Sequence, residues 1–271
     1  LNVHIYNPNL KSRIEQNASY KINVRSKKSD LSWWIAASGK LVHRAWGVRT
    51  NYDTPTGAFT YKKDNVNGNW NANGKAGLTR TLDKKRLLRW DMNAQLSYLH
   101  SVDFDIAYDN VPTQLSKVNT WNPLFNSKLS YRKGNFSAIL TGEWSGRFVR
   151  SNRKDFENIN AHDFQYGIVT QYTIPFVKLT VGTDIMIFSR RGYNSDFMNT
   201  DDLVCNALFT RSFCHGNIVA KLKAFDLLHK LSNKTFSVNA QGRTETWQNS
   251  LPHYLLLSFA VKTSSKKKVG K

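Results

Sequence analysis

The sequence predicts an all-β fold, a transmembrane antiparallel up-and-down β-barrel. Three observations predict it: apolar and polar residues alternate with a period of two, the alternating segments are long, and short connections alternate with long ones. No run of 18 apolar residues occurs, so a transmembrane helix is not expected. Each strand should therefore present one apolar and one polar face.

The clearest alternation begins at Leu88. Every second residue from there to Tyr98 is apolar, while the residues between them, from Arg89 to Ser97, are polar or charged. The same pattern predicts strands over residues 70–78, 136–148, 177–187, 218–224 and 255–261, and a weaker form predicts strands over 18–24, 125–131, 164–172 and 203–213. Residues 31–42 read as a strand with poor alternation. About eleven strands are expected.

The connections between these segments alternate in length. Short ones are expected at residues 27–30, 83–85, 133–135, 174–175 and 214–217, and long loops at 45–66, 101–115, 151–162, 192–201 and 229–250. Aromatic residues gather near both kinds of connection: Tyr131, Phe136, Tyr172, Phe176 and Phe213 near short turns, and Tyr98, Trp144, Phe148 and Tyr254 near long loops. Tight turns on one side, long loops on the other and two aromatic girdles are typical of outer-membrane barrels. A soluble β-sandwich with the same alternation is the alternative.

The chain is strongly basic, with 39 Lys+Arg against 19 Asp+Glu and a formal charge of +20. Nucleic-acid binders are often this basic, and a stretch such as Arg147-Phe148-Val149-Arg150 could stack on bases. The positive residues, however, occur mostly in turns, at strand ends and on the polar face of the predicted strands. That distribution favours contact with outer-membrane lipid and lipopolysaccharide phosphates, and no nucleic-acid partner is expected.

No catalytic, cofactor-binding or metal site is predicted, and the chain is not expected to be an enzyme. Asp103, Asp105 and Asp109 could coordinate Ca²⁺ but favour loop solvation, and the pair Asp201-Asp202 is similarly ambiguous. The seven histidines lack the close spacing of a zinc site, and no nucleophile or nucleotide motif occurs. The two cysteines, Cys205 and Cys214, lie too far apart along a strand to bridge each other.

Two regions carry a family resemblance. The stretch Asn7-Pro8-Asn9-Leu10-Lys11 is similar to one that precedes a barrel strand in TonB-dependent receptors. The carboxyl-terminal stretches 221–228, 237–247 and 251–259 resemble the last strands of the outer-membrane β-barrel family of Bacteroidetes, which is similar to the C-terminal barrel of TonB-dependent receptors. The aromatic residue nearest to the end of the last predicted strand is Phe259. A basic tail follows this strand.

The resemblance implies that residues 1–262 are the carboxyl-terminal part of an outer-membrane barrel of about 22 strands, with residues 263–271 as a tail. Nothing in the sequence corresponds to a plug or a TonB box. The implied function is the barrel wall and extracellular ligand-binding loops of a receptor-like protein for nutrient uptake. Implied partners are an upstream plug domain, the TonB energising complex and a surface lipoprotein. The alternatives are a structural or adhesive outer-membrane barrel without transport, and a soluble basic β protein that binds nucleic acid.

Overall fold

The computed structural model of the chain is all-β. It describes residues 1–26, 30–109, 111–153, 156–194, 196–214, 217–230, 234–239, 242–247 and 253–261. Strands make up 76% of the structure, and the single helical element described is one 3-10 turn, η1 (Asp196–Met198). No helix in the described ranges has the length and apolar character needed to cross a membrane.

The main sheet is antiparallel and has 11 strands among the described residues. In chain order they are β2 (Ile14–Ser26), β3 (Leu31–His43), β6 (Asn69–Thr81), β7 (Leu88–Phe104), β9 (Leu115–Lys133), β10 (Phe136–Ser151), β11 (Ile159–Ile174), β12 (Leu179–Arg191), β13 (Asp201–Phe213), β14 (Ile218–Phe225) and β17 (Tyr254–Val261). Each of the eleven segments expected from the alternation corresponds to one of these strands. One boundary differs, because the strand expected to begin at Val177 begins at Leu179. The eleven-stranded antiparallel sheet is thus confirmed.

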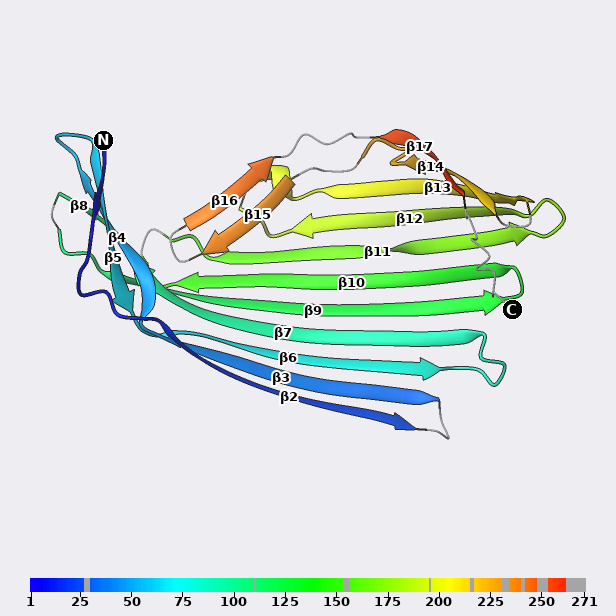
Figure 1. Cartoon of the computed structure of the whole chain (residues 1–271), viewed down its shortest axis with the longest axis horizontal. Coiled ribbons are helices and arrows are strands. Elements are labelled where there is room, and N and C mark those ends of the chain that lie inside the picture. The colour runs from blue at the N-terminus through cyan, green and yellow to red at the C-terminus, as the bar shows by residue number, and fades with distance from the viewer. Residues whose placement is uncertain are drawn as a thin grey trace, which may run out of the picture.

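Each strand of the main sheet pairs with the next main-sheet strand along the chain. Further strands that lie within the long connections are not part of this sheet. Figure 1 shows the short turns gathered at one end of the curved sheet, which we call the turn end, and the long connections at the other, the loop end. The two edge strands, β2 and β17, both run from the loop end to the turn end. No pairing between these two edges is found in the described part of the chain, so the sheet is open.

Three of the expected long loops contain strands, so the prediction of loops over the whole of residues 45–66, 101–115 and 229–250 is wrong. Residues 45–66 form a hairpin of β4 (Ala45–Asp53) and β5 (Ala58–Val66), β8 (Ile106–Tyr108) follows β7, and β15 (Lys234–Asn239) pairs with β16 (Gly242–Trp247). Together with β1 (Asn2–Ile5), the first three of these strands build a small sheet in the order β1-β5-β4-β8. Figure 1 places this small sheet at the loop end of the main sheet.

The strand expected to start at Val177 also starts later than predicted. Residues 175–178 form the turn between β11 and β12, and Lys178 takes a positive φ of 52° there. Pro175 lacks an amide hydrogen and cannot donate to the ladder, so the turn begins at the proline. The apolar side chain of Val177 therefore lies in a turn and does not continue the alternation.

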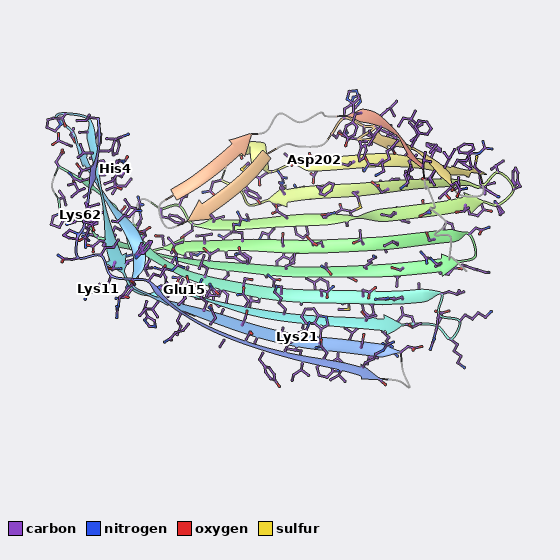
Figure 2. All side chains as sticks on the ribbon, viewed as in Figure 1. His4, Lys11, Glu15, Lys21, Lys62 and Asp202 are labelled. Carbon is purple, nitrogen blue, oxygen red and sulfur yellow. The ribbon has the colours of Figure 1, made fainter. Side chains whose placement is uncertain are left out.

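Away from the loop end, the described part of the chain places no second layer over either face of the main sheet (Figure 2). Leu96 is 47% exposed, Leu140 is 55% exposed and Leu257 is 58% exposed. The chain has an accessible surface of 18,808 Å², against roughly 12,000 Å² for a compact soluble monomer of this mass. The apolar alternation therefore does not build the core of a sandwich.

The buried apolar clusters that are described lie at the loop end instead. One consists of Val42, Ala45, Val66, Val102 and Phe104, where the small sheet joins the main one. The other consists of Val118, Val149, Ile159 and Ala161, with Phe156 and Tyr193 packed against it. The connections thus fold back onto the sheet only at this end.

Candidate functional site

The strand register gathers the apolar side chains on one side of the main sheet, which we call the apolar face. Directly paired residues of antiparallel strands point to the same side, so the pairing defines rows of side chains across the sheet. One row contains Ile22, Ile35, Ala76, Ala94, Phe125, Trp144 and Phe164, and another contains Trp90, Leu129, Leu140, Ile168, Ile185 and Cys205. The opposite side is the polar face.

Charged residues on the apolar face occur only near the two ends of the described strands. Those near the turn end are Arg80, Lys133 and Arg211, and those near the loop end are Lys117, Arg150, Arg191 and Asp201. The Arg191 guanidinium pairs with the Asp201 carboxylate at 2.6 Å. The band between the two borders is uncharged, and both borders are dominated by cations.

The width of this uncharged band follows from one central strand. On β10, the apolar face runs from Phe136 near one border to Phe148 near the other. Twelve residue steps of about 3.4 Å, inclined by about 40° as in closed barrels, span roughly 30 Å. The hydrocarbon core of a bilayer is about 30 Å thick. The band therefore has the dimension of a lipid bilayer interior.

Aromatic rings mark the border of the band at the loop end. Trp70 lies 4.7 Å from Tyr98, and Tyr98 lies 4.3 Å from Trp121, measured between ring centroids. At the turn end, Tyr131 and Phe136 lie 6.3 Å apart. Trp and Tyr combine an apolar ring with a hydrogen-bonding group, which suits them to the interface between an apolar phase and water.

The polar face carries the charges of the middle of the sheet. The Asp91 carboxylate accepts hydrogen bonds from Thr79 Oγ1 at 2.6 Å and from the Arg89 guanidinium at 2.7 Å. The Asn93 amide donates to the Asn126 side chain at 3.0 Å. A polar hollow of about 510 Å³ lies over these residues. This face is therefore built for contact with water or with a polar partner.

Within the described ranges, the polar face is covered near the loop end. There Tyr193, which follows β12, donates its phenolic proton to the Asp163 carboxylate at 2.9 Å. Burial first, and the charge of the Asp163 carboxylate second, raise the pKa of Tyr193 to about 12. The phenol thus stays protonated and fixes the connection after β12 against β11.

The small sheet at the loop end encloses a groove of about 940 Å³. Its lining contains His4, Ile5, Tyr6, Asn7, Leu10, Trp46, Val48, Thr50, Phe59, Tyr61, Lys63, Phe104, Asp105, Ile106 and Arg153. Most of these are apolar or aromatic, and the charged ones lie among them. Figure 2 shows His4 projecting from this sheet. Such a groove, with few polar groups among apolar walls, has the character of a small-molecule site.

Aromatic rings form a row across the small sheet beside the groove. Ring centroids of His4 and Tyr61 lie 5.0 Å apart, those of Tyr61 and Phe59 6.1 Å, and those of Phe59 and Tyr52 4.7 Å. The first two pairs are nearly parallel, at 21° and 16°. The register explains the row, because His4 pairs with Tyr61, and Phe59 with Tyr52.

Polar contacts hold the groove together. The Arg49 guanidinium donates to the Asp64 carboxylate at 2.7 Å and stacks on the Phe104 ring at 4.0 Å. That hydrogen bond holds the pKa of Asp64 below its usual value. The Asn65 side chain donates to the Lys11 carbonyl at 2.9 Å, which ties the chain before β2 to β5. The walls are thereby joined across long sequence separations.

The three aspartates considered as cation ligands have separate partners. Asp103 accepts from the Phe104 amide at 2.8 Å, Asp105 pairs with Arg153 at 3.1 Å, and Asp109 accepts from Thr54 Oγ1 at 2.7 Å. Among the described residues no group of three or more His, Cys, Asp or Glu side chains could hold a metal ion. Asp105 and its partner Arg153 instead line the groove.

The other predicted residues are placed as follows. Asp201 lies on the apolar face and its neighbour Asp202 on the polar face, where it is buried. His229 and His253, 24 positions apart, stack with ring centroids 3.6 Å apart, which the sequence spacing did not suggest. Cys205 lies in β13, Cys214 lies in the turn after it, and both are free. The basic tail 263–271 lies outside the described residues.

The groove is the site that the sequence reasoning missed. It depends on β4 and β5, whose alternation of Val48, Thr50 and Tyr52 with polar residues could have predicted a hairpin around Thr54 to Gly57. Comparisons of the chain with protein-family models, with curated proteins and with solved structures found no match, so the resemblance to the outer-membrane barrel family of Bacteroidetes stays a prediction.

Proposed function

We propose that the chain forms part of the wall of an outer-membrane β-barrel in a TonB-dependent receptor-like protein, with the small sheet as part of its ligand-binding surface. The observation that carries this proposal is the uncharged band of the apolar face, bordered at both ends by cations and aromatic rings. In lipid, such a band needs no second protein layer. In water, an exposed apolar area of this size would drive aggregation.

The strand directions support a larger closed structure. With 11 antiparallel strands, β2 and β17 run in the same direction. Pairing them with each other would be parallel, so antiparallel closure needs an odd number of further strands. A barrel of about 22 strands meets this condition. Closure also supplies partners for the edge amides and carbonyls, which would each cost several kcal/mol if left unpaired in lipid.

The groove supports the receptor part of the proposal. It lies beyond the loop-end border of the apolar face, so a barrel inserted with this border at the outer surface presents the groove to the exterior. Its apolar and aromatic lining, with Lys63 and the Asp105–Arg153 pair, can hold an amphipathic ligand. Energy for uptake would come from a plug and the TonB complex, which the described sheet does not contain.

The two native cysteines test the membrane orientation. Cys205 lies within the apolar face and Cys214 in a turn outside it. In the whole protein reconstituted in bilayers, with Cys214 replaced by serine and Cys205 left as the one labelled cysteine, the attached fluorophore should be quenched by lipids brominated in their acyl chains. The Cys205→Ser variant, labelled at Cys214, is the matched control and should respond only to a water-soluble quencher.

A second measurement addresses closure. The whole protein refolded in detergent should migrate differently on gels with and without heating, as closed barrels do. Equal migration in both samples, together with aqueous quenching of the Cys205 label, would overturn the proposal.

A further inference from the structure

The apolar face contains a hollow of about 790 Å³ near its loop-end border. Its floor consists of small residues on neighbouring strands, namely Ala18, Ala37, Gly39, Ala72 and Gly74, and its rim carries larger ones, namely Tyr20, Leu96, Trp70, Tyr98 and Trp121. A Cβ added at Gly74 would meet open space. The hollow is thus a depression in a surface that is otherwise filled by large apolar side chains.

Polar groups follow directly beyond the aromatic rim. Tyr98 donates its hydroxyl proton to Asn119 Oδ1 at 2.7 Å, and His100 Nδ1 lies 2.6 Å from the same oxygen. Arg150 is the strand partner of Asn119, and Lys117 lies two residues farther along β9 on the same face. The order from the band outward is therefore apolar hollow, aromatic rim, neutral polar groups and cations.

The Arg150 cation is held in place by neutral groups. The Arg150 guanidinium donates to the Val149 carbonyl at 3.1 Å and to Asn160 Oδ1 at 2.7 Å, both neutral acceptors. On the main-sheet strands β2, β3, β6, β7, β9 and β10, every Asp and Glu side chain belongs to the polar face. The charged strand residues described on the apolar face at this place, Arg150 and Lys117, are therefore both cations.

We infer that this place is a binding site for one anionic lipid, with its phosphate held by Arg150 and Lys117 and an acyl chain seated in the hollow. The inference rests on the proposed function, since it needs a bilayer around the apolar face. An acyl chain suits the hollow because a flexible apolar chain restores the dispersion contacts that a void would lose. Arginine and lysine favour phosphate through charge-assisted hydrogen bonds.

The test measures lipid retention by the whole protein. Native mass spectrometry of protein released from detergent would compare dioleoylphosphatidylglycerol with dioleoylphosphatidylcholine, which share acyl chains and differ in head-group charge. We expect retention of one phosphatidylglycerol with a preference of about tenfold or more. The double variant Arg150→Gln/Lys117→Gln should lose this preference, and Gly74→Leu, which fills the hollow, should reduce retention of both lipids.

The control variant is Arg80→Gln, which removes a cation from the same face at the turn end and should leave the preference unchanged. The label on Cys205 separates the two proposals. Quenching of that label by brominated lipids with no phosphatidylglycerol preference, or with a preference that survives the double variant, overturns the lipid site alone. A loss of preference in Arg80→Gln as large as in the double variant overturns it too, and failure of the protein to insert overturns both proposals.

Discussion

Tyr193 donates a hydrogen bond to the carboxylate of Asp163 at the loop end, and its pKa lies near 12. Because the folded pKa is higher than that of the unfolded phenol, about 10, its contribution to stability is complete below pH 10. It is lost as the pH rises through 12. We expect the melting temperature in detergent to fall over this range, and the Tyr193→Phe variant to show less of that fall.

At neutral pH, the Tyr193→Phe variant should lose about 1.5–3 kcal/mol of stability, the usual contribution of a hydrogen bond to a charged group. Thermal melting followed by circular dichroism checks both effects. An unchanged alkaline profile in the variant would mean that another group carries the dependence.

Gly77 and Gly74 give a matched pair on opposite faces of β6. A Cβ on Gly77 would overlap the indole nitrogen of Trp34, which lies over this glycine, whereas a Cβ on Gly74 meets nothing. Gly77→Ala should therefore displace the Trp34 ring and cost roughly 1–3 kcal/mol, while Gly74→Ala should be neutral or slightly stabilising. Equal melting temperatures for the two variants would contradict this reading of the Trp34 contact.

At the scale of the strand, the two faces of β10 should respond differently to charge. Leu140 belongs to the apolar face and Thr141 to the polar face. Leu140→Arg should destabilise the protein in bilayers by about 2–4 kcal/mol, the cost of a charge in the lipid-facing middle of a barrel. Thr141→Arg should cost much less. Denaturant titration in liposomes measures both, and equal costs would argue against a lipid environment for the apolar face.

Strands of the main sheet could be predicted from sequence because each carries its own alternation. In β7, the side chains from Leu88 to Tyr98 report two environments directly, whatever the rest of the chain does. The strands of the small sheet were missed for the opposite reason. The turn residues Pro55 and Gly57 and the many polar side chains of 45–66 favour a loop, and the length of the connection matched that expectation.

Local pattern could have predicted the hairpin of β4 and β5, but not the groove that this hairpin helps to form. Its walls bring His4 beside Tyr61, and Asp105 beside Arg153, through pairings that depend on how the small sheet meets the main one. β1 pairs with β5 in parallel over four residues, an arrangement that no spacing in the sequence reveals. The aspartates at 103–109 were considered as cation ligands because their neighbours in space could not be known.

At the scale of the whole molecule, the open edges lead to a prediction about residues 1–271 on their own. β2 offers a 13-residue edge that is exposed throughout nearly its whole length. Such an edge pairs readily with another chain. Refolded alone in detergent, the chain should form concentration-dependent oligomers, measured by size-exclusion chromatography with light scattering. A monomer at all concentrations would show that the edges are closed in another way.

The common direction of β2 and β17 also restricts how such a sheet can change over evolutionary time. Duplication or deletion of a hairpin adds or removes two strands, so it leaves both margins pointing the same way. Only an event that contributes a lone strand alters the parity. Relatives that differ by whole hairpins would therefore all depend on a complementary segment with an odd number of strands.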